Sequence, residues 1–172
     1  GTPEVGEALN TPGADNEVVL PLLPDLQITE IWPGNEPGSN LTADWFEITN
    51  VGDIPWTPDL GGLYFDDESQ APADADLISG ITSIAPGEVV VAIDDTSIVE
   101  FLSVWESSYD LTGIQIGTYS GAGLSQGGDG VTLWIGDPTS GGILVDFESY
   151  PDANVNGGQS YDVELAAFST VG

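Results

Sequence analysis

Asp44-Trp-Phe-Glu-Ile-Thr-Asn50 is the stretch that decides the fold, because its apolar and polar residues alternate. Phe46 and Ile48 fall on one face of an extended strand and the residues between them on the other, the two-residue period of a half-buried β-strand. After a polar link comes Leu60-Gly-Gly-Leu-Tyr-Phe-Asp-Asp67, an apolar run that ends in adjacent carboxylates, which must face water or a cation. We therefore predict a core strand, a turn, a second strand and an acidic loop.

Short strand-like segments separated by turn signals continue along the chain. They lie at 26–32, 44–50, 60–67, 77–84, 88–93, 113–119, 131–135, 143–147 and 161–168. One helix is expected at 97–105, where Ile98, Phe101, Leu102 and Trp105 share a helical face and Asp95 or Thr96 is placed to cap the first turn. Short connections favour antiparallel neighbours, so the pattern predicts an all-β antiparallel sandwich with one short helix.

The strand expected at 26–32 contains a conflict. Leu26 and Ile28 share a face, and strict alternation places Glu30 on that face too, with Ile31 outside. Either a bulge after Thr29 shifts the register, or Glu30 is a buried carboxylate that backbone amides or a metal ion must satisfy. We favour an inward Glu30 that accepts hydrogen bonds from loop N–H groups.

The charge of the chain is strongly one-sided. Its 172 residues include 29 Asp and Glu but no Lys, Arg or His, for a formal net charge of -29. Carboxylates can then be neutralised only by protons, metal ions, backbone N–H groups or the terminal amine. Such a surface repels phosphate groups, so we expect no nucleic-acid binding and no attraction to anionic membranes. Cationic partners remain compatible with it.

Composition also bears on location. The 40% apolar and 9% aromatic content is that of a folded protein rather than of a disordered acidic chain. The chain has no Cys, and no apolar run approaches the ~20 residues of a membrane-spanning helix. The chain starts at Gly1 and lacks Met, which suggests a processed product or an excised region, and it offers trypsin-like proteases no cleavage site. We expect an extracellular protein, secreted or at a cell surface.

The N-terminal segment differs from the rest of the chain. Residues 1–16 show no periodicity, and Glu17-Val-Val-Leu-Pro-Leu-Leu-Pro24 is apolar but interrupted by prolines. We divide the chain into an extended arm at 1–24 and a sandwich domain at 25–172. The arm either packs on its own domain as an edge strand or adds to the open sheet edge of a neighbouring copy. Its expected partner-binding residues are Val18, Val19, Leu20, Leu22 and Leu23.

Seven short motifs occur together in a recognisable order. They are Ile28-Thr-Glu-Ile31, Asp44 to Asn50, Asp59-Leu-Gly-Gly62 with Asp66-Asp67, Ile84-Ala-Pro-Gly-Glu-Val-Val-Val91, Phe101 to Trp105, Gly123-Leu-Ser to Gly128-Asp-Gly-Val-Thr-Leu133, and Val145-Asp to Tyr150-Pro-Asp152. In this order, over about residues 25–160, the chain resembles the secreted prokaryotic branch of the lamin tail domain family. The resemblance implies an immunoglobulin-like sandwich and a module without catalytic activity. The family often ends in Gly-x-Ser followed closely by Arg, whereas here Gly158-Gln-Ser160 is followed by Tyr161-Asp162.

Clustered acids in loops are candidates for Ca²⁺ ligands, because calcium takes six to eight oxygen ligands. The expected metal residues are Asp66, Asp67, Glu68, Asp74 and Asp76, with a second group at Asp94 and Asp95. Single acids close to loops are Asp44, Asp53, Asp129 and Asp137. None of these has EF-hand spacing, and the alternative is that all of them are solvated loop residues.

Catalysis is disfavoured by elimination, because the chain has no His, Cys, Lys or Arg to act as base, nucleophile or phosphate clamp. Glu30 and Glu47 could form a glycosidase-like carboxylate pair, but with so many acids such pairs arise by chance. Trp32, Trp56 and Trp134 are candidates for a sugar platform where they face outward. Asn40-Leu-Thr42 is a glycosylation sequon.

Two functions remain. The first is a non-catalytic extracellular module that assembles with other copies of itself into a filament, surface layer or matrix. The arm makes the contact between copies, and Ca²⁺ offsets the electrostatic repulsion between them. The alternative is an accessory binding module of a secreted hydrolase, with carbohydrate as its candidate ligand.

Overall fold

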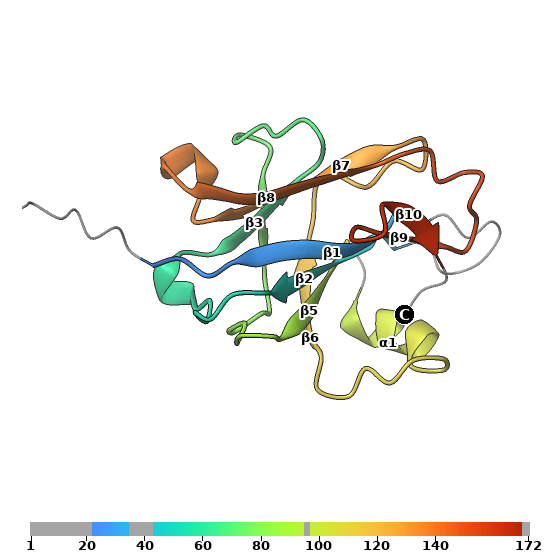
Figure 1. Ribbon diagram of the computed structural model, residues 1–172, viewed down its shortest axis with the longest axis horizontal. Helices are drawn as coiled ribbons and strands as arrows, with labels where there is room; N and C mark the ends of the chain where they lie inside the picture. The colour runs from blue at the N-terminus through green and yellow to red at the C-terminus, as the bar shows by residue number, and fades with distance from the viewer. Residues whose placement is uncertain (1–21, 35–42, 95–96, 170–172) are drawn as a thin grey trace, which may run out of the picture.

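The computed structural model describes residues 22–34, 43–94 and 97–169, which form two sheets packed face to face (Figure 1). The strands are β1 (Leu26–Trp32), β2 (Trp45–Asn50), β3 (Leu63–Asp66), β4 (Asp76–Ile78), β5 (Val89–Asp94), β6 (Gln115–Tyr119), β7 (Asp129–Ile135), β8 (Ile143–Tyr150), β9 (Ser160–Asp162) and β10 (Ala167–Ser169). The helices are α1 (Ile98–Trp105) and the 3-10 turns η1 (Pro58–Leu60) and η2 (Pro138–Ser140). The expected β-sandwich with one short helix is thus confirmed in outline.

The six-stranded sheet has the order β10-β9-β1-β2-β5-β6, and the four-stranded sheet has the order β4-β3-β7-β8. The expectation of purely antiparallel pairing is wrong at one place, because β5 and β6 pair in parallel. The chain leaves β5, forms α1 on the outer face of the sheet and returns as β6, the crossover that a parallel pair requires. The other strand pairs among the described residues are antiparallel.

β2 is a core strand, as its alternation predicts. Phe46 and Ile48 are fully buried between the two sheets, and Phe46 packs on Phe65 of β3 with ring centroids 5.2 Å apart. Aliphatic residues of both sheets complete this inner core. The opposite face of β2 carries Trp45, which belongs to a second apolar cluster between the six-stranded sheet and α1. The middle of this sheet is therefore covered on both faces.

A bulge in β1 resolves the conflict at Glu30. Ile28 pairs with Ile48 and Ile31 pairs with Phe46, so two residues of β1 stand opposite one residue of β2. The extra residue returns Ile31 to the inner core with none of its surface exposed. The inward Glu30 that we favoured is wrong, since Glu30 lies half-buried on the outer face, where Ser160 Oγ donates a hydrogen bond to it. The bulge was the correct alternative.

Element boundaries also differ from expectation at several places, three of which have a clear local cause. Of the strand expected at 77–84, only Leu77 and Ile78 are in a strand, β4, because Gly80 adopts a φ of 99° just beyond them. The last expected strand is a hairpin of β9 and β10, with Ala166 at a φ of 50° in its turn. The helix α1 begins one residue later than expected and is capped by Ser97 rather than by the residues before it.

Candidate functional site

The ends of β3 and β7 bring three carboxyl groups together. Asp67 and Glu68 follow β3, Asp129 begins β7, and one carboxylate oxygen from each lies within 4.8 Å of the others. We call this group the acidic triad. Its two parts are far apart in sequence and meet because β3 and β7 are paired neighbours, with Asp66 opposite Thr132.

Asp129 is the best-anchored member of the acidic triad. Only 8% of its surface is exposed. Its Oδ2 accepts a hydrogen bond from the Ser125 amide at 2.6 Å, and its Oδ1 accepts from the Gly130 amide at 2.8 Å. Backbone donors of this kind fix the direction of the carboxyl group. Asp129 is therefore a preorganised acceptor rather than a freely solvated side chain.

Glu68 has the opposite environment. Its side chain is exposed, and the hydrogen-bonded Asp129 carboxyl raises the pKa of Glu68, with further repulsion from Asp129 and Asp67. Three carboxyl groups at this spacing repel one another, and the chain contains no basic side chain that could offset the charge. Either a shared proton or a bound cation relieves that repulsion. The acidic triad could hold a metal ion of the oxygen-preferring class.

Asp66 is the most buried acid of the loop after β3, with 1% of its surface exposed. Its Oδ2 accepts from Ser69 Oγ at 2.8 Å and from the Ala71 amide at 2.6 Å. Its Oδ1 is buried and has no hydrogen-bond partner. Asp66 thus organises the turn that carries Asp67 and Glu68 and keeps one acceptor oxygen unused.

A second acidic region lies at Asp44, directly before β2. Asp44 Oδ2 accepts a hydrogen bond from the Leu124 amide at 2.6 Å. Burial nevertheless raises the pKa of Asp44 to about 7, and repulsion from Asp94 and Asp129 adds to the rise. The nearby Tyr119 hydroxyl is buried without a hydrogen-bond partner, and burial followed by the charges of Asp44 and Asp94 raises its pKa well above the ordinary value.

The predicted metal residues thus lie at different places in the structure. Asp67 and Glu68 lie in the acidic triad, Asp66 supports their turn, and Asp94 lies beside Asp44 instead. Asp74 and Asp76 are outside the triad, and Asp95 lies outside the described residues.

Asp129 was expected only as a single acid near a loop. Nothing local in the sequence links it to Glu68. The pairing of β3 with β7 is a long-range feature that the residues around each acid do not encode.

Other expected site residues have different roles. Trp32, Trp56 and Trp134 are exposed by 1%, 2% and 4%, so they pack in the interior instead of forming a sugar platform. Asp137 caps η2, where the Thr139 hydroxyl and amide lower its pKa by hydrogen bonding. Of the arm residues, Val18, Val19 and Leu20 lie outside the described residues, as does Asn40. Leu22 is 78% exposed and Leu23 is half-buried.

The chain was compared with family models, with curated proteins and with solved structures, and none of the three comparisons gave a match. The resemblance to the lamin tail domain family stays a prediction. No helix among the described residues is long and apolar enough to cross a membrane.

Proposed function

We propose that this chain is a non-catalytic extracellular interaction module, of the immunoglobulin-like lamin tail type, whose acidic triad binds Ca²⁺. The observation that carries the proposal is the convergence of three carboxylate oxygens within 4.8 Å in a chain without a basic side chain. Calcium at this point takes Asp67, Glu68 and Asp129 as ligands, with water completing its shell.

Calcium binding ties the loop after β3 to the start of β7. The ion stabilises the folded state because the unfolded chain does not bring these carboxylates together. At a Ca²⁺ concentration 100 times Kd the stabilisation is ~2.7 kcal/mol. For a chain of this length that corresponds to a rise in melting temperature of about 5–10 °C.

Calorimetric titration with Ca²⁺ and thermal melting in Ca²⁺ or EDTA test the proposal. Asp129→Asn removes one ligand charge, and the exposed Asp59→Asn is the matched control that removes the same charge elsewhere. We expect saturable binding and a higher melting temperature in the parent chain and in Asp59→Asn, with at least a tenfold weaker affinity in Asp129→Asn. Equal responses in all three proteins would show that calcium acts only by screening the net charge.

We further propose that copies of the chain assemble through the arm. Support comes from β8, an eight-residue strand at the edge of the four-stranded sheet, where Ile143 and Leu144 remain 45% and 46% exposed. Further along, β1 lies against β8, where the Ile28 amide donates a hydrogen bond to Asp146 Oδ2 at 2.7 Å, so the first residues of β8 are the part of this edge that accepts an added strand. A head-to-tail contact of this kind propagates into a filament or layer.

The test of assembly is a comparison of the full chain with a chain that lacks residues 1–24, by light scattering and electron microscopy, in Ca²⁺ and in EDTA. We expect particles larger than one chain only for the full protein. Assembly that survives the deletion refutes the arm mechanism. The deletion does not touch the acidic triad, so its outcome leaves the calcium proposal to its own test.

A further inference from the structure

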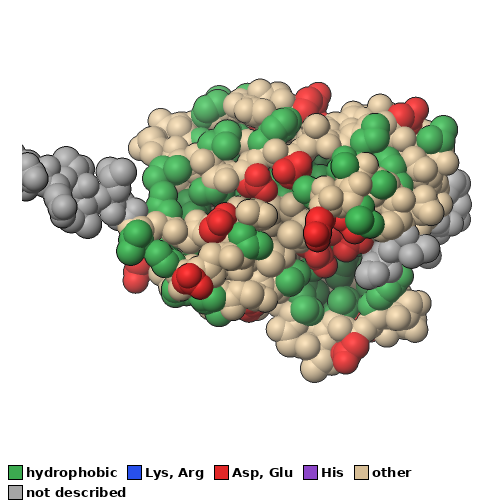
Figure 2. Space-filling view, viewed as in Figure 1, with side chains coloured by type: hydrophobic (Ala, Val, Ile, Leu, Met, Phe, Trp, Pro, Cys, Tyr) green, Lys and Arg blue, Asp and Glu red, His purple; other side chains and the backbone are tan. Residues whose placement is uncertain are grey.

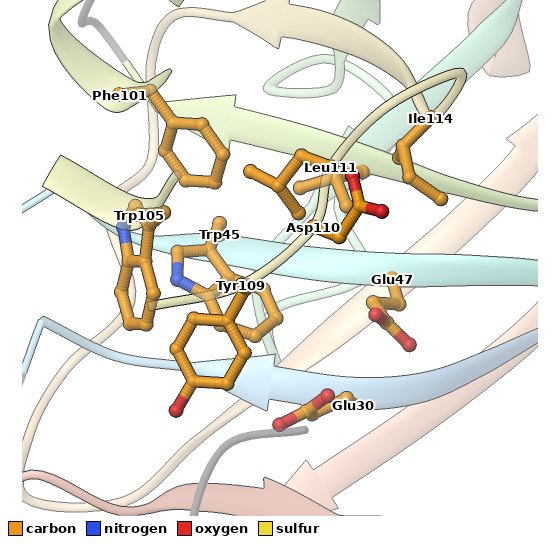
Figure 3. A pocket seen from close by; sticks show the side chains of 10 residues that line it. Glu30, Trp45, Glu47, Phe101, Trp105, Tyr109, Asp110, Leu111 and Ile114 are labelled. Atoms are coloured by element: carbon orange, nitrogen blue, oxygen red, sulfur yellow. The ribbon is translucent and has the colours of Figure 1, made fainter. Parts of the chain in front are cut away.

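A pocket with a volume of about 240 Å³ lies on the outer face of the six-stranded sheet, under α1 and the segment that follows it (Figure 3). The side chains that define its chemistry are Trp45, Phe101, Trp105, Tyr109, Glu30 and Glu47. None of them belongs to the acidic triad. Figure 2 shows acidic (red) and apolar (green) side chains side by side where the lobe that carries α1 meets the rest of the molecule.

Aromatic rings form one part of the wall. Trp45 of β2 meets Trp105 of α1 edge to face, with centroids 5.5 Å apart and planes at 89°. The ring of Tyr109 lies 5.8 Å from that of Trp105 at 42°, and the ring of Phe101 lies 6.0 Å from it at 32°. Since the faces of aromatic rings carry negative electrostatic potential, a wall of this kind attracts organic cations.

Two carboxylates form the other part. Glu30 and Glu47 come from the paired strands β1 and β2, and Figure 3 shows them along the side of the pocket opposite Phe101 and Trp105. The bulge in β1 is what places Glu30 on the same face as Glu47. Burial, and then repulsion from Glu30, raise the pKa of Glu47 to about 7 although Thr29 Oγ1 donates a hydrogen bond to it. Asp110 adds a third acid on the loop side.

We propose that this pocket binds the alkylammonium group of a lysine side chain presented by a basic peptide of another protein. The alkyl stem lies against Trp45 and Trp105, and the ammonium group reaches Glu30 and Glu47. The ligand is not a side chain of a second copy, because this chain has no Lys, Arg or His.

Alternative ligands fit the pocket less well. A neutral sugar brings no positive charge to the two neighbouring half-buried carboxylates, and an anion is repelled by them. A metal ion needs several oxygen ligands that converge on one point. Among the described residues, the acidic triad is the group of three acids that meets this condition. Drug-sized ligands occupy pockets of ~300–1,000 Å³, so the smaller volume here suits a single side chain.

A second hollow shows where the rest of the peptide lies. It has a volume of about 450 Å³, shares Glu30 and Glu47 with the pocket, and continues along β1 to Asp162 and Glu164. Its lining supplies two further acids for neighbouring basic residues of the ligand. The continuity of the two hollows favours an extended peptide over a free amine.

The ligands for the test are a glycine-flanked peptide with one lysine, the same peptide with norleucine, and free n-butylamine. Norleucine keeps the alkyl stem and lacks the ammonium group. Binding is measured by tryptophan fluorescence and calorimetry at 0.15 M salt in EDTA. We expect the lysine peptide to bind, n-butylamine to bind more weakly, and the norleucine peptide not to bind.

Two pairs of substitutions distinguish binding in the pocket from general attraction by the net charge of 29 acidic residues. Glu30→Gln with Glu47→Gln removes two charges in the pocket, and Asp53→Asn with Asp59→Asn removes two exposed charges outside it. We expect about a tenfold or greater loss of affinity in the first variant and no more than twofold in the second. Tyr109→Leu should also weaken binding while circular dichroism stays unchanged.

Three results would overturn the proposal. Equal affinity for the lysine and norleucine peptides excludes recognition of the ammonium group. Equal losses in the two double variants reduce the effect to net charge. Binding of n-butylamine as tight as that of the peptide excludes a peptide ligand along β1.

Discussion

Trp45 of β2 and Trp105 of α1 meet edge to face at 5.5 Å, and this contact holds the helix on the outer face of the sheet. Trp105 also contacts Trp32 at 5.2 Å and 87°. One helical side chain therefore packs against two neighbouring strands. The outer apolar cluster depends on this side chain more than on any aliphatic residue of α1, where Ile98 remains 37% exposed.

Replacing Trp105 by Ala should lower the free energy of unfolding by about 3–5 kcal/mol, the usual result of removing a large buried aromatic side chain. Urea denaturation measures the change. Val99→Ala is the control on the same helix, because Val99 is 76% exposed, and its effect should stay within about 0.5 kcal/mol. Similar effects for both variants would mean that α1 is not packed on the sheet.

The pKa of Glu47 predicts a pH dependence of stability. The pKa of this carboxyl group is about 7 in the folded protein, whereas its ordinary value is 4.5. The folded protein therefore holds the proton more tightly than the unfolded chain does. Its contribution to stability is therefore present below pH 4.5 and is lost as the pH rises towards 7. Glu47→Gln should be more stable than the parent by about 2–3 kcal/mol at pH 8 and nearly equal to it at pH 4. Chemical denaturation at both pH values checks this, and a variant less stable than the parent at pH 8 contradicts it.

The hydrogen bond from the Leu124 amide to Asp44 Oδ2 predicts a contrast between two variants. Asp44→Asn keeps an acceptor for the amide and removes a charge that burial disfavours, so it should not destabilise the protein at pH 8. Asp44→Ala leaves the amide without its acceptor and should lower stability by about 1–3 kcal/mol relative to Asp44→Asn. Thermal and urea denaturation of the pair measure the difference. Equal stabilities would show that the hydrogen bond contributes nothing.

The capping box of α1 predicts a further contrast. Ser97 Oγ accepts from the Glu100 amide at 3.1 Å, and Glu100 Oε2 accepts from the Ser97 amide at 3.4 Å. Ser97→Ala should cost about 1 kcal/mol. Ser103→Ala, an exposed site inside the same helix, should be neutral or slightly stabilising because Ala has the higher helix propensity. Urea denaturation of both variants distinguishes a cap effect from a general effect of removing serine.

Local alternation was enough to predict β2 and the two faces of the central sheet. Phe46 and Ile48 point inward in the structure as their spacing requires. The conflict at Glu30 was visible in the sequence, but its resolution was not, because a bulge depends on the partner strand and not on the strand itself. The same limit applies to Asp129, because its neighbour Glu68 follows the partner strand β3, far away in the sequence.

The parallel pairing of β5 with β6 had a signal that could have been used. A strand, an amphipathic helix and a further strand follow one another from Val89 to Tyr119, which is the order of a parallel crossover unit. The pocket under α1 had no such signal. Tyr109 and Trp45 come together only because α1 lies on the outer face of β2, and the sequence pattern of the helix does not state which surface it covers.

The position of β1 has a consequence for how the chain folds during synthesis. β1 pairs on one side with β2, which follows it directly, and on the other side with β9, which is made more than a hundred residues later. Until β9 leaves the ribosome, a strand with exposed backbone donors and acceptors stays open to pairing between nascent chains. Topologies that depend on such distant pairings fold in milliseconds to seconds rather than microseconds. Mutual repulsion between acidic nascent chains protects that open strand while the chain is completed.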